Sequence, residues 1–168
     1  MVIRIFKYFL LALLVAFSQT ILSNLTSILG IAPNYGTIII LVIILWREYP
    51  LAYPAAFMVG IIIDALNPEF FGYGAAVRFA IAIAAYEIRQ HLDVEQLPAQ
   101  IYLLIGSEIS FQLLYQSVVN SLDMGVLPKI LLEVSLPTLV YTTVVGAAVL
   151  LVTSLQFRIE VSRRSTIG

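Results

Sequence analysis

The sequence predicts an all-α membrane protein built as a six-transmembrane-helix bundle. Three observations predict this fold class. Six apolar stretches fill a chain of only 168 residues, and most of the charged residues lie outside these stretches. Hydrophobic residues make up 61% of the chain and charged residues only 11%, and the mean hydropathy is +0.99. Because a small soluble domain needs a large polar surface, this composition favours one integral membrane domain that covers residues 1–168.

The six expected helices differ in length. Crossing a hydrocarbon layer about 30 Å thick takes roughly 20 helical residues. The second and third helices are shorter, so we expect them to be sheltered inside the bundle, extended by their neighbours or matched by local thinning of the bilayer. Pro54 and Pro137 lie beyond the helix starts and are expected to kink or offset their helices. The expected ranges are 5–26, 33–46, 51–66, 72–90, 99–121 and 129–155.

The first stretch has two interpretations. Arg4 and Lys7 ahead of an apolar run give it the outline of a secretory signal peptide. Because the apolar run continues through Ile21 and Leu22, we expect a first transmembrane helix instead. The fourth helix is rich in glycine and alanine, which predicts a central position, clasped by its neighbours or by another chain.

Positive charges predict the orientation of the bundle. When the connections are assigned alternately to the two sides, the second side holds only Lys129, and Arg78 lies inside a helix. The positive-inside rule then places both termini in the cytoplasm, which requires an even number of crossings, such as six. The first side holds Arg4, Lys7, Arg47, Arg89, Arg158, Arg163 and Arg164.

Composition and motifs exclude several classes of function. A net charge of −1 provides no basic field for nucleic acid. The absence of cysteine removes thiol nucleophiles and thiolate metal sites, and the single histidine, His91, is too few for a histidine cluster. The sequence has no Ser/His/Asp set, no glycine-rich phosphate loop and no His-Glu-x-x-His spacing. We therefore expect no enzymatic activity, no cofactor and no metal site.

Two ionisable residues lie at similar depths in neighbouring helices. Asp64 lies about a turn before the end of the third expected helix, and Arg78 about two turns into the fourth. Charged groups at membrane depth need a partner, so we expect these two side chains to approach each other and staple the hairpin. The alternative is that Arg78 points to a partner subunit while Asp64 caps loop amides.

Glu108 is the most costly charge, because it falls near the middle of the fifth expected helix. A polar stripe follows it on one helix face and should face protein instead of lipid. The stripe is either a substrate lining or docking face, or a seam hydrogen-bonded to the first and sixth helices. The stripe contains Gln112, Tyr115, Gln116 and Asn120, and the expected seam partners are Ser18, Gln19, Ser23, Thr138, Tyr141 or Thr142.

Three marks resemble a known family. Ala32-Pro33-Asn34 precedes an apolar helix, Gly60 and Asp64 stand four residues apart at the end of the next, and Gly72 follows eight residues later. These marks, with the size and hydropathy of the chain, resemble the rod shape-determining protein MreD family. In that family Pro-Asp or Pro-Asn opens the second helix, Gly-x-x-x-Asp closes the third and glycine begins the fourth. Ala75-Ala76 and Arg78 stand where relatives often carry a polar asparagine or histidine.

The resemblance implies a fold like the S components of energy-coupling-factor transporters and a non-catalytic scaffold of the bacterial rod complex. Such a scaffold lies in the inner membrane among its lipids, binds MreC and links MreB filaments to peptidoglycan synthesis by RodA and a class B penicillin-binding protein. The alternatives are the substrate-binding S component of a vitamin transporter and a small channel or proton-coupled carrier that uses Glu108. The candidate partner-binding or structural residues are Pro33, Asn34, Gly60, Asp64, Gly72, Arg78 and Glu108. We expect the partner surface around Asp64, Gly72 and Arg78, beside an apolar lateral groove.

Overall fold

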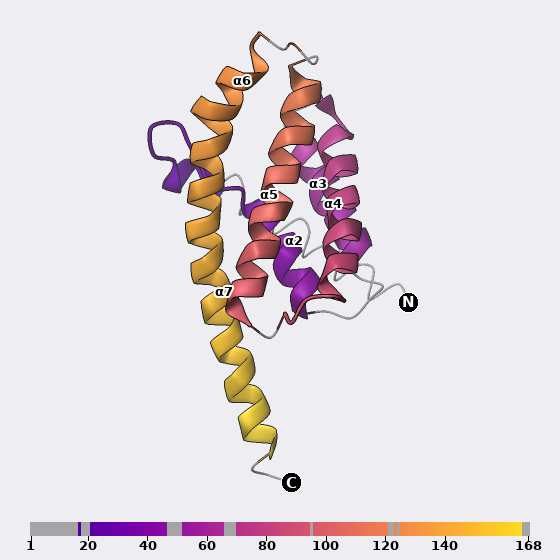
Figure 1. Cartoon of the computed structure of the whole chain (residues 1–168), viewed down its shortest axis with the longest axis vertical. Coiled ribbons are helices and arrows are strands. Elements are labelled where there is room, and N and C mark those ends of the chain that lie inside the picture. Colours follow the sequence, from indigo (N-terminus) through magenta and orange to yellow (C-terminus); the bar gives the residue numbers. More distant parts are fainter. Residues whose placement is uncertain are drawn as a thin grey trace.

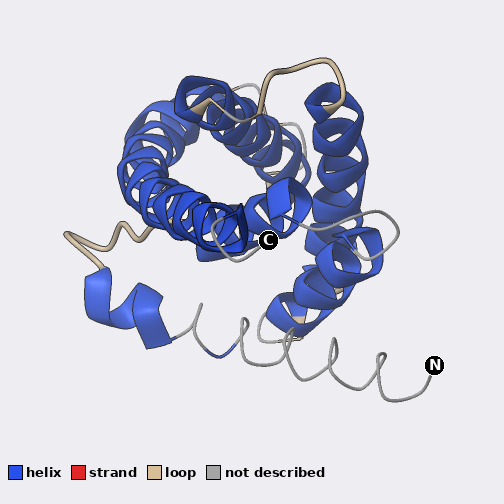
Figure 2. Cartoon of the chain, turned by 90° about the horizontal axis from the view of Figure 1, so that it is seen from below, coloured by secondary structure: helices blue, strands red, loops and turns tan. Residues whose placement is uncertain are grey.

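The computed structural model describes residues 17, 21–46, 52–65, 70–94, 96–120, 123 and 125–165. Every regular element within these ranges is helical (Figure 2). The expected helices two to five are confirmed to within two residues at each end. Most of the expected first helix lies outside the described residues, although residues 21–26 are helical. The elements are α2 (Tyr35–Trp46), α3 (Ala52–Asp64), α4 (Tyr73–Arg89), α5 (Leu97–Val119), α6 (Leu127–Ile130), the π-helix η2 (Leu131–Ser135) and α7 (Leu136–Ser165).

The helices pack around α2. In Figure 1, α5 lies between α7 on one side and α3 and α4 on the other, and α2 contacts α3, α4, α5 and α7. Leu41 and Ile44 of α2 are each 1% exposed, and they belong to one core cluster with Val59 of α3, Leu104 of α5 and Leu150 of α7. The expected sheltering of this short helix inside the bundle is therefore confirmed.

Within this chain α4 is not the central helix, so that part of the expectation is wrong, while clasping of α4 by another chain stays a prediction. One face of α4 is buried, with Val77, Ala82 and Ala85 toward the core, but Ala80 and Ala84 on another face are exposed. The helix at the centre is α2, because its isoleucines and leucines present large apolar side chains in nearly every direction. Small residues identify close packing, but they do not say how many faces of a helix are covered.

Glycine allows α3 and α4 to pack closely. A Cβ added at Gly60 would collide with the Cα of Ala75, so the two backbones approach without a side chain between them.

A side-chain hydrogen bond joins α4 to the end of α2. Arg89 in the last turn of α4 donates a hydrogen bond from Nη1 to the carbonyl oxygen of Ile44 at 2.6 Å. This bond satisfies one of the carbonyls that the end of α2 leaves without a helical partner.

The two deeper prolines have different effects. Pro54 lies in the first turn of α3, where the missing N–H removes no ladder hydrogen bond, so the expected kink there is not needed. Pro137 is the second residue of α7 and stands two residues after the end of the π-helical turn η2. The expected offset near Pro137 therefore takes the form of a wide turn inside an otherwise continuous helical segment.

Two helices are long and apolar enough to cross a membrane, judged by their length and composition. They are Leu97–Val119 and Leu127–Ser154, and the second continues across α6, η2 and α7. Shorter apolar helices cover Tyr35–Leu45 and Tyr53–Asp64. The last part of α7 extends beyond the other helices at the lower end of Figure 1.

Candidate functional site: a polar network, an ion pair and a lateral groove

Asn34 joins three helices through its backbone and its side chain. It is the residue before α2, and its Oδ1 accepts a hydrogen bond from the backbone N–H of Thr37 at 3.3 Å, which caps the helix. Its backbone N–H donates to Oγ1 of Thr142 in α7 at 2.9 Å. Its Nδ2 donates to Oε2 of Glu108 in α5 at 3.1 Å. The neighbouring Pro33 is fully buried.

Glu108 is fully buried at 0% exposure and is satisfied by polar side chains. Gln112, one turn further along α5, donates from Nε2 to Oε1 at 2.7 Å, and Asn34 donates to the same carboxylate. The side chain of Thr37 is a further hydrogen-bond partner. We call Asn34, Thr37, Glu108, Gln112 and Thr142 the polar network. Because hydrogen bonds from α2 and α5 converge on one buried carboxylate, the network fixes the position of these helices.

The expectation that Glu108 faces protein is confirmed, but its partners differ from the expected ones. Within the described residues, the other helix that supplies its partners is α2, through Asn34 and Thr37. Thr142 reaches the network through the backbone of Asn34 instead of the carboxylate. Ser18 and Gln19 lie outside the described residues. Sequence analysis singled out Asn34 as a family mark but did not pair it with Glu108, and it missed Thr37, whose signal was its position three residues after the cap.

The approach of Asp64 and Arg78 is confirmed. Arg78 Nη1 lies 3.6 Å from Oδ1 of Asp64, and both side chains are buried. Asp64 also accepts a hydrogen bond at Oδ2 from the backbone N–H of Ala75 at 2.8 Å. That N–H belongs to the first turn of α4, where Gly72 offers no side-chain cap. The carboxylate therefore pairs with the arginine and also caps the next helix, where the positive end of the helix dipole favours it.

Two glycines make this hairpin possible. Gly72 begins α4 with φ of 86°, in the left-handed region that residues with a side chain rarely adopt. A Cβ at Gly74 would collide with Oδ1 of Asp64 and would lie 2.8 Å from Nη1 of Arg78. The ion pair therefore occupies the volume that a larger residue at position 74 would take.

An aromatic row continues from the ion pair along α5. The guanidinium of Arg78 lies over the ring of Phe111, 4.5 Å from its centroid. Phe111 stacks on Tyr115 with centroids 5.3 Å apart, and Tyr115 contacts the ring of Tyr73 at 6.1 Å. Tyr73 in turn donates its hydroxyl to the carbonyl oxygen of Leu114 at 2.8 Å. This row binds the start of α4 to α5 beside the charges.

A pocket separates the polar network from the ion pair. Its volume is about 250 Å³. We call it the polar pocket, and both of the sites described above contribute to its walls. It is lined by Ser23, Ala32, Pro33, Asn34, Ile63, Asp64, Arg78, Phe111, Gln112, Tyr115 and Thr138. Four of the predicted residues line this pocket, namely Pro33, Asn34, Asp64 and Arg78. Gly60 and Gly72 are not among the lining residues and belong to the α3–α4 hairpin.

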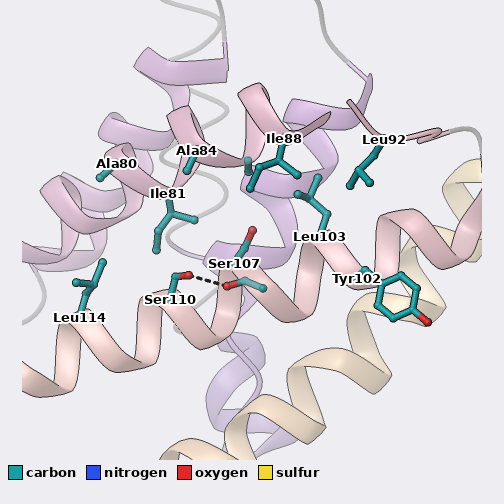
Figure 3. A pocket seen from close by; sticks show the side chains of 12 residues that line it. Ala80, Ile81, Ala84, Ile88, Leu92, Tyr102, Leu103, Ser107, Ser110 and Leu114 are labelled. Carbon is teal, nitrogen blue, oxygen red and sulfur yellow. Dashed lines mark hydrogen bonds between the residues drawn. The ribbon is translucent and has the colours of Figure 1, made fainter. Parts of the chain in front are cut away.

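A second hollow, which we call the lateral groove, runs between α4 and α5. Its volume is about 540 Å³. Figure 3 shows Ala80 and Ala84 of α4 facing Ser110 and Leu114 of α5 across it. A Cβ added at Gly106 would meet no atom within 4 Å, so the floor of the groove is open at that residue. The lining residues are Ala80, Ile81, Ala84, Ala85, Ile88, Leu92, Tyr102, Leu103, Gly106, Ser107, Ser110 and Leu114.

Within the described residues, no group of three or more acidic or histidine side chains could hold a metal ion. Comparisons with protein-family models, with curated proteins and with solved structures find no match for the chain. The class that the fold and the site define is therefore a helical protein with two helices able to cross a membrane, a buried polar network and an apolar groove.

Proposed function

We propose that the chain is a non-catalytic membrane scaffold that docks the single transmembrane helix of a partner protein in the lateral groove. The groove carries this proposal. It is apolar, it is open on the side away from the core, and small residues line its centre. In lipid, helices associate where small residues allow their backbones to approach closely, since burial of apolar surface gives no advantage there.

The spacing of the small residues fits a helix as the occupant. Ala80 and Ala84 are one turn apart on α4, and Gly106 and Ser110 are one turn apart on α5, and all four are exposed. The groove extends along α5 from Tyr102 to Leu114, twelve residues or about 18 Å. More than half of a membrane crossing could therefore rest in it.

Exposed apolar side chains support a membrane location. Val140 and Val144 on α7 are 57% and 64% exposed, and Leu132 in η2 is 65% exposed. Tyr102 and Leu113 extend the apolar surface over α5. Contiguous apolar surface of this kind is expected where lipid or another membrane helix covers the protein. The proposed topology is multi-pass in the bacterial inner membrane with cytoplasmic termini, as the charge distribution predicts.

The resemblance to the MreD family gives the proposed partners. The docked helix would belong to MreC, and the assembly would include MreB, RodA and a class B penicillin-binding protein. In this proposal the Asp64–Arg78 pair keeps α3 and α4 together, so that α4 presents a fixed wall to the partner. The chain then acts by holding proteins together during cell-wall elongation, with no reaction of its own.

A second candidate function has a specific observation in its favour. The polar pocket could hold a small solute, as the S component of a vitamin transporter would. Its volume of about 250 Å³ is below the roughly 300–1,000 Å³ typical of pockets for drug-sized ligands, so the scaffold is favoured.

A matched pair of variants tests the docking. Gly106→Leu would place a side chain in the groove from a position where an added Cβ meets open space, and Ala148→Leu adds bulk on the exposed face of α7. The full chain would be purified from its native host in mild detergent, and the bound proteins identified by mass spectrometry. We expect wall-elongation proteins with the unaltered chain and with Ala148→Leu, and a loss of about tenfold or more with Gly106→Leu. Unchanged capture by Gly106→Leu would contradict the docking site, and capture of an ATPase pair would favour the transporter.

A further inference from the structure

The polar pocket contains a buried cation whose hydrogen bonds are incomplete. Arg78 is only 7% exposed and lines the pocket. Its Nε and Nη1 are buried, and neither has a hydrogen-bond acceptor within the described part of the chain. The 3.6 Å separation from Asp64 is longer than a hydrogen bond, so the contact is an electrostatic one. Buried charged donors without acceptors are strongly unfavourable, which indicates an acceptor outside the described residues, such as a guest in the pocket.

The rest of the pocket can supply both donors and acceptors to a guest. Asp64 brings a carboxylate next to the guanidinium, and Tyr115, Gln112 and Thr138 add a phenol, an amide and a hydroxyl to the walls. Ile63 and Phe111 provide an apolar side. The pocket therefore presents one positive group, one negative group and neutral polar groups around a small volume.

Charge balance selects the type of guest. A simple anion drawn to Arg78 would also meet Asp64, and the Glu108 carboxylate stands behind it in the polar network. A simple cation drawn to the carboxylates would meet the guanidinium instead. A group that carries both charges avoids both penalties, since its anionic end can reach Arg78 while its cationic end remains near Asp64. Guanidinium groups favour phosphate, which they bind with two parallel hydrogen bonds.

We propose that the polar pocket binds a phosphate group that carries a protonated amine, the chemistry of phosphoethanolamine. Two sources carry this group, namely the headgroup of a membrane phospholipid and a free zwitterion in the surrounding water. The pocket lies close to the ends of α3 and α4, so a lipid headgroup or a solute from the water could reach it. Asp64 is the last residue of α3, and Arg78 is five residues into α4, about 8 Å from the helix start. The inference goes beyond the scaffold and does not rest on the docking of a partner.

Native mass spectrometry of the full purified chain tests the inference. The probes are phosphatidylethanolamine, phosphatidylglycerol with the same acyl chains, and free phosphoethanolamine. Arg78→Gln removes the guanidinium. Thr138→Met narrows the pocket and leaves the ion pair in place, so it remains informative if Arg78→Gln does not fold. Lys129→Gln is the control, since it removes an exposed cation that is not part of the pocket.

We expect one phosphatidylethanolamine per chain, with affinity reduced about tenfold or more by Arg78→Gln and by Thr138→Met and unchanged by Lys129→Gln. Equal binding of free phosphoethanolamine would support the same chemistry with a soluble source. Equal binding of phosphatidylglycerol, which has no amine, would overturn the proposal that the guest carries both charges, because Asp64 would then contribute nothing to binding. Binding that neither pocket variant reduces would also overturn the proposal, leaving water as the occupant. Capture of partner proteins by the Gly106→Leu variant is a separate measurement, so the two proposals can fail independently.

Discussion

At the scale of single residues, the structure depends on a few side chains that each satisfy several partners. Asn34 is buried, and it caps α2, donates its amide to Glu108 and donates its backbone N–H to Thr142. The sequence predicts that Glu108 is sheltered, because polar residues recur at helical spacing after it. It does not predict the partner, because the two residues are separated by 74 positions and only tertiary packing brings them together.

The first prediction concerns how Glu108 stabilises the bundle. In Glu108→Gln the remaining amide oxygen can still accept from Asn34 or Gln112, whereas Glu108→Leu leaves both donors buried without an acceptor. We expect Glu108→Leu to lose about 2–4 kcal/mol and Glu108→Gln about 1 kcal/mol or less. Thermal unfolding in detergent measures both. Equal stability of the two variants would show that acceptance of these hydrogen bonds contributes little.

The second prediction compares two glycines. Gly74→Ala places a Cβ against Asp64 and Arg78, whereas Gly106→Ala meets open space on α5. We expect Gly74→Ala to destabilise the protein by about 1–3 kcal/mol, and Gly106→Ala to be neutral or to stabilise it by up to about 1 kcal/mol. Thermal unfolding in detergent distinguishes the two variants. Unchanged stability of Gly74→Ala would indicate that the ion pair can move aside.

At the scale of helices, patterns along the sequence locate the elements well but do not determine their neighbours. The bounds of α2 to α5 follow from the apolar runs and from prolines near their starts. The alanine content of α4 predicts close packing, but it does not predict that α2 holds the central position, because close packing on one face does not bury the others. The π-helical turn at Leu131–Ser135 was also missed, since only the later proline hinted at it.

The third prediction tests the approach of α3 and α4. In Gly60→Ala the new Cβ collides first with the Cα of Ala75 and then with its Cβ, which lies 2.9 Å away. We expect a destabilisation of about 1–3 kcal/mol. The double variant Gly60→Ala with Ala75→Gly should recover only part of it, because the backbone atom remains. Full recovery of stability, measured by thermal unfolding, would show that the new Cβ clashes only with the methyl group of Ala75 and not with its backbone.

At the scale of the whole molecule, the charges and the helices together predict a topology. His91 lies in the connection between α4 and α5, and Asp123 lies between α5 and α6, at the opposite end of the bundle in Figure 1. The 23 residues of α5 separate them by about 34 Å. Helix length and composition identify two candidate spans among the described residues, and six crossings stay a prediction.

The fourth prediction tests this topology directly. The chain contains no cysteine, so single cysteines can be introduced without a background. We expect His91→Cys to react with a membrane-impermeant maleimide only from the cytoplasmic side, and Asp123→Cys only from the outer side. Labelling of intact cells and of inverted vesicles compares the two sides. Reaction of both positions from one side would rule out a crossing by α5.

The wide turn at Leu131–Ser135 has a consequence for how the chain tolerates changes in length. A π-helical turn accommodates one residue more than an α-helical turn does, so this segment holds a surplus residue. Removing Leu132, which is 65% exposed, should let the segment tighten into ordinary α-helix while Thr142 keeps its place beside Asn34. The short stretch before it, with Lys129, should keep its orientation about the helix axis, because only the surplus residue is lost. A deletion of one residue should thus be absorbed here, whereas the same deletion within α5 would carry Glu108 away from its donors.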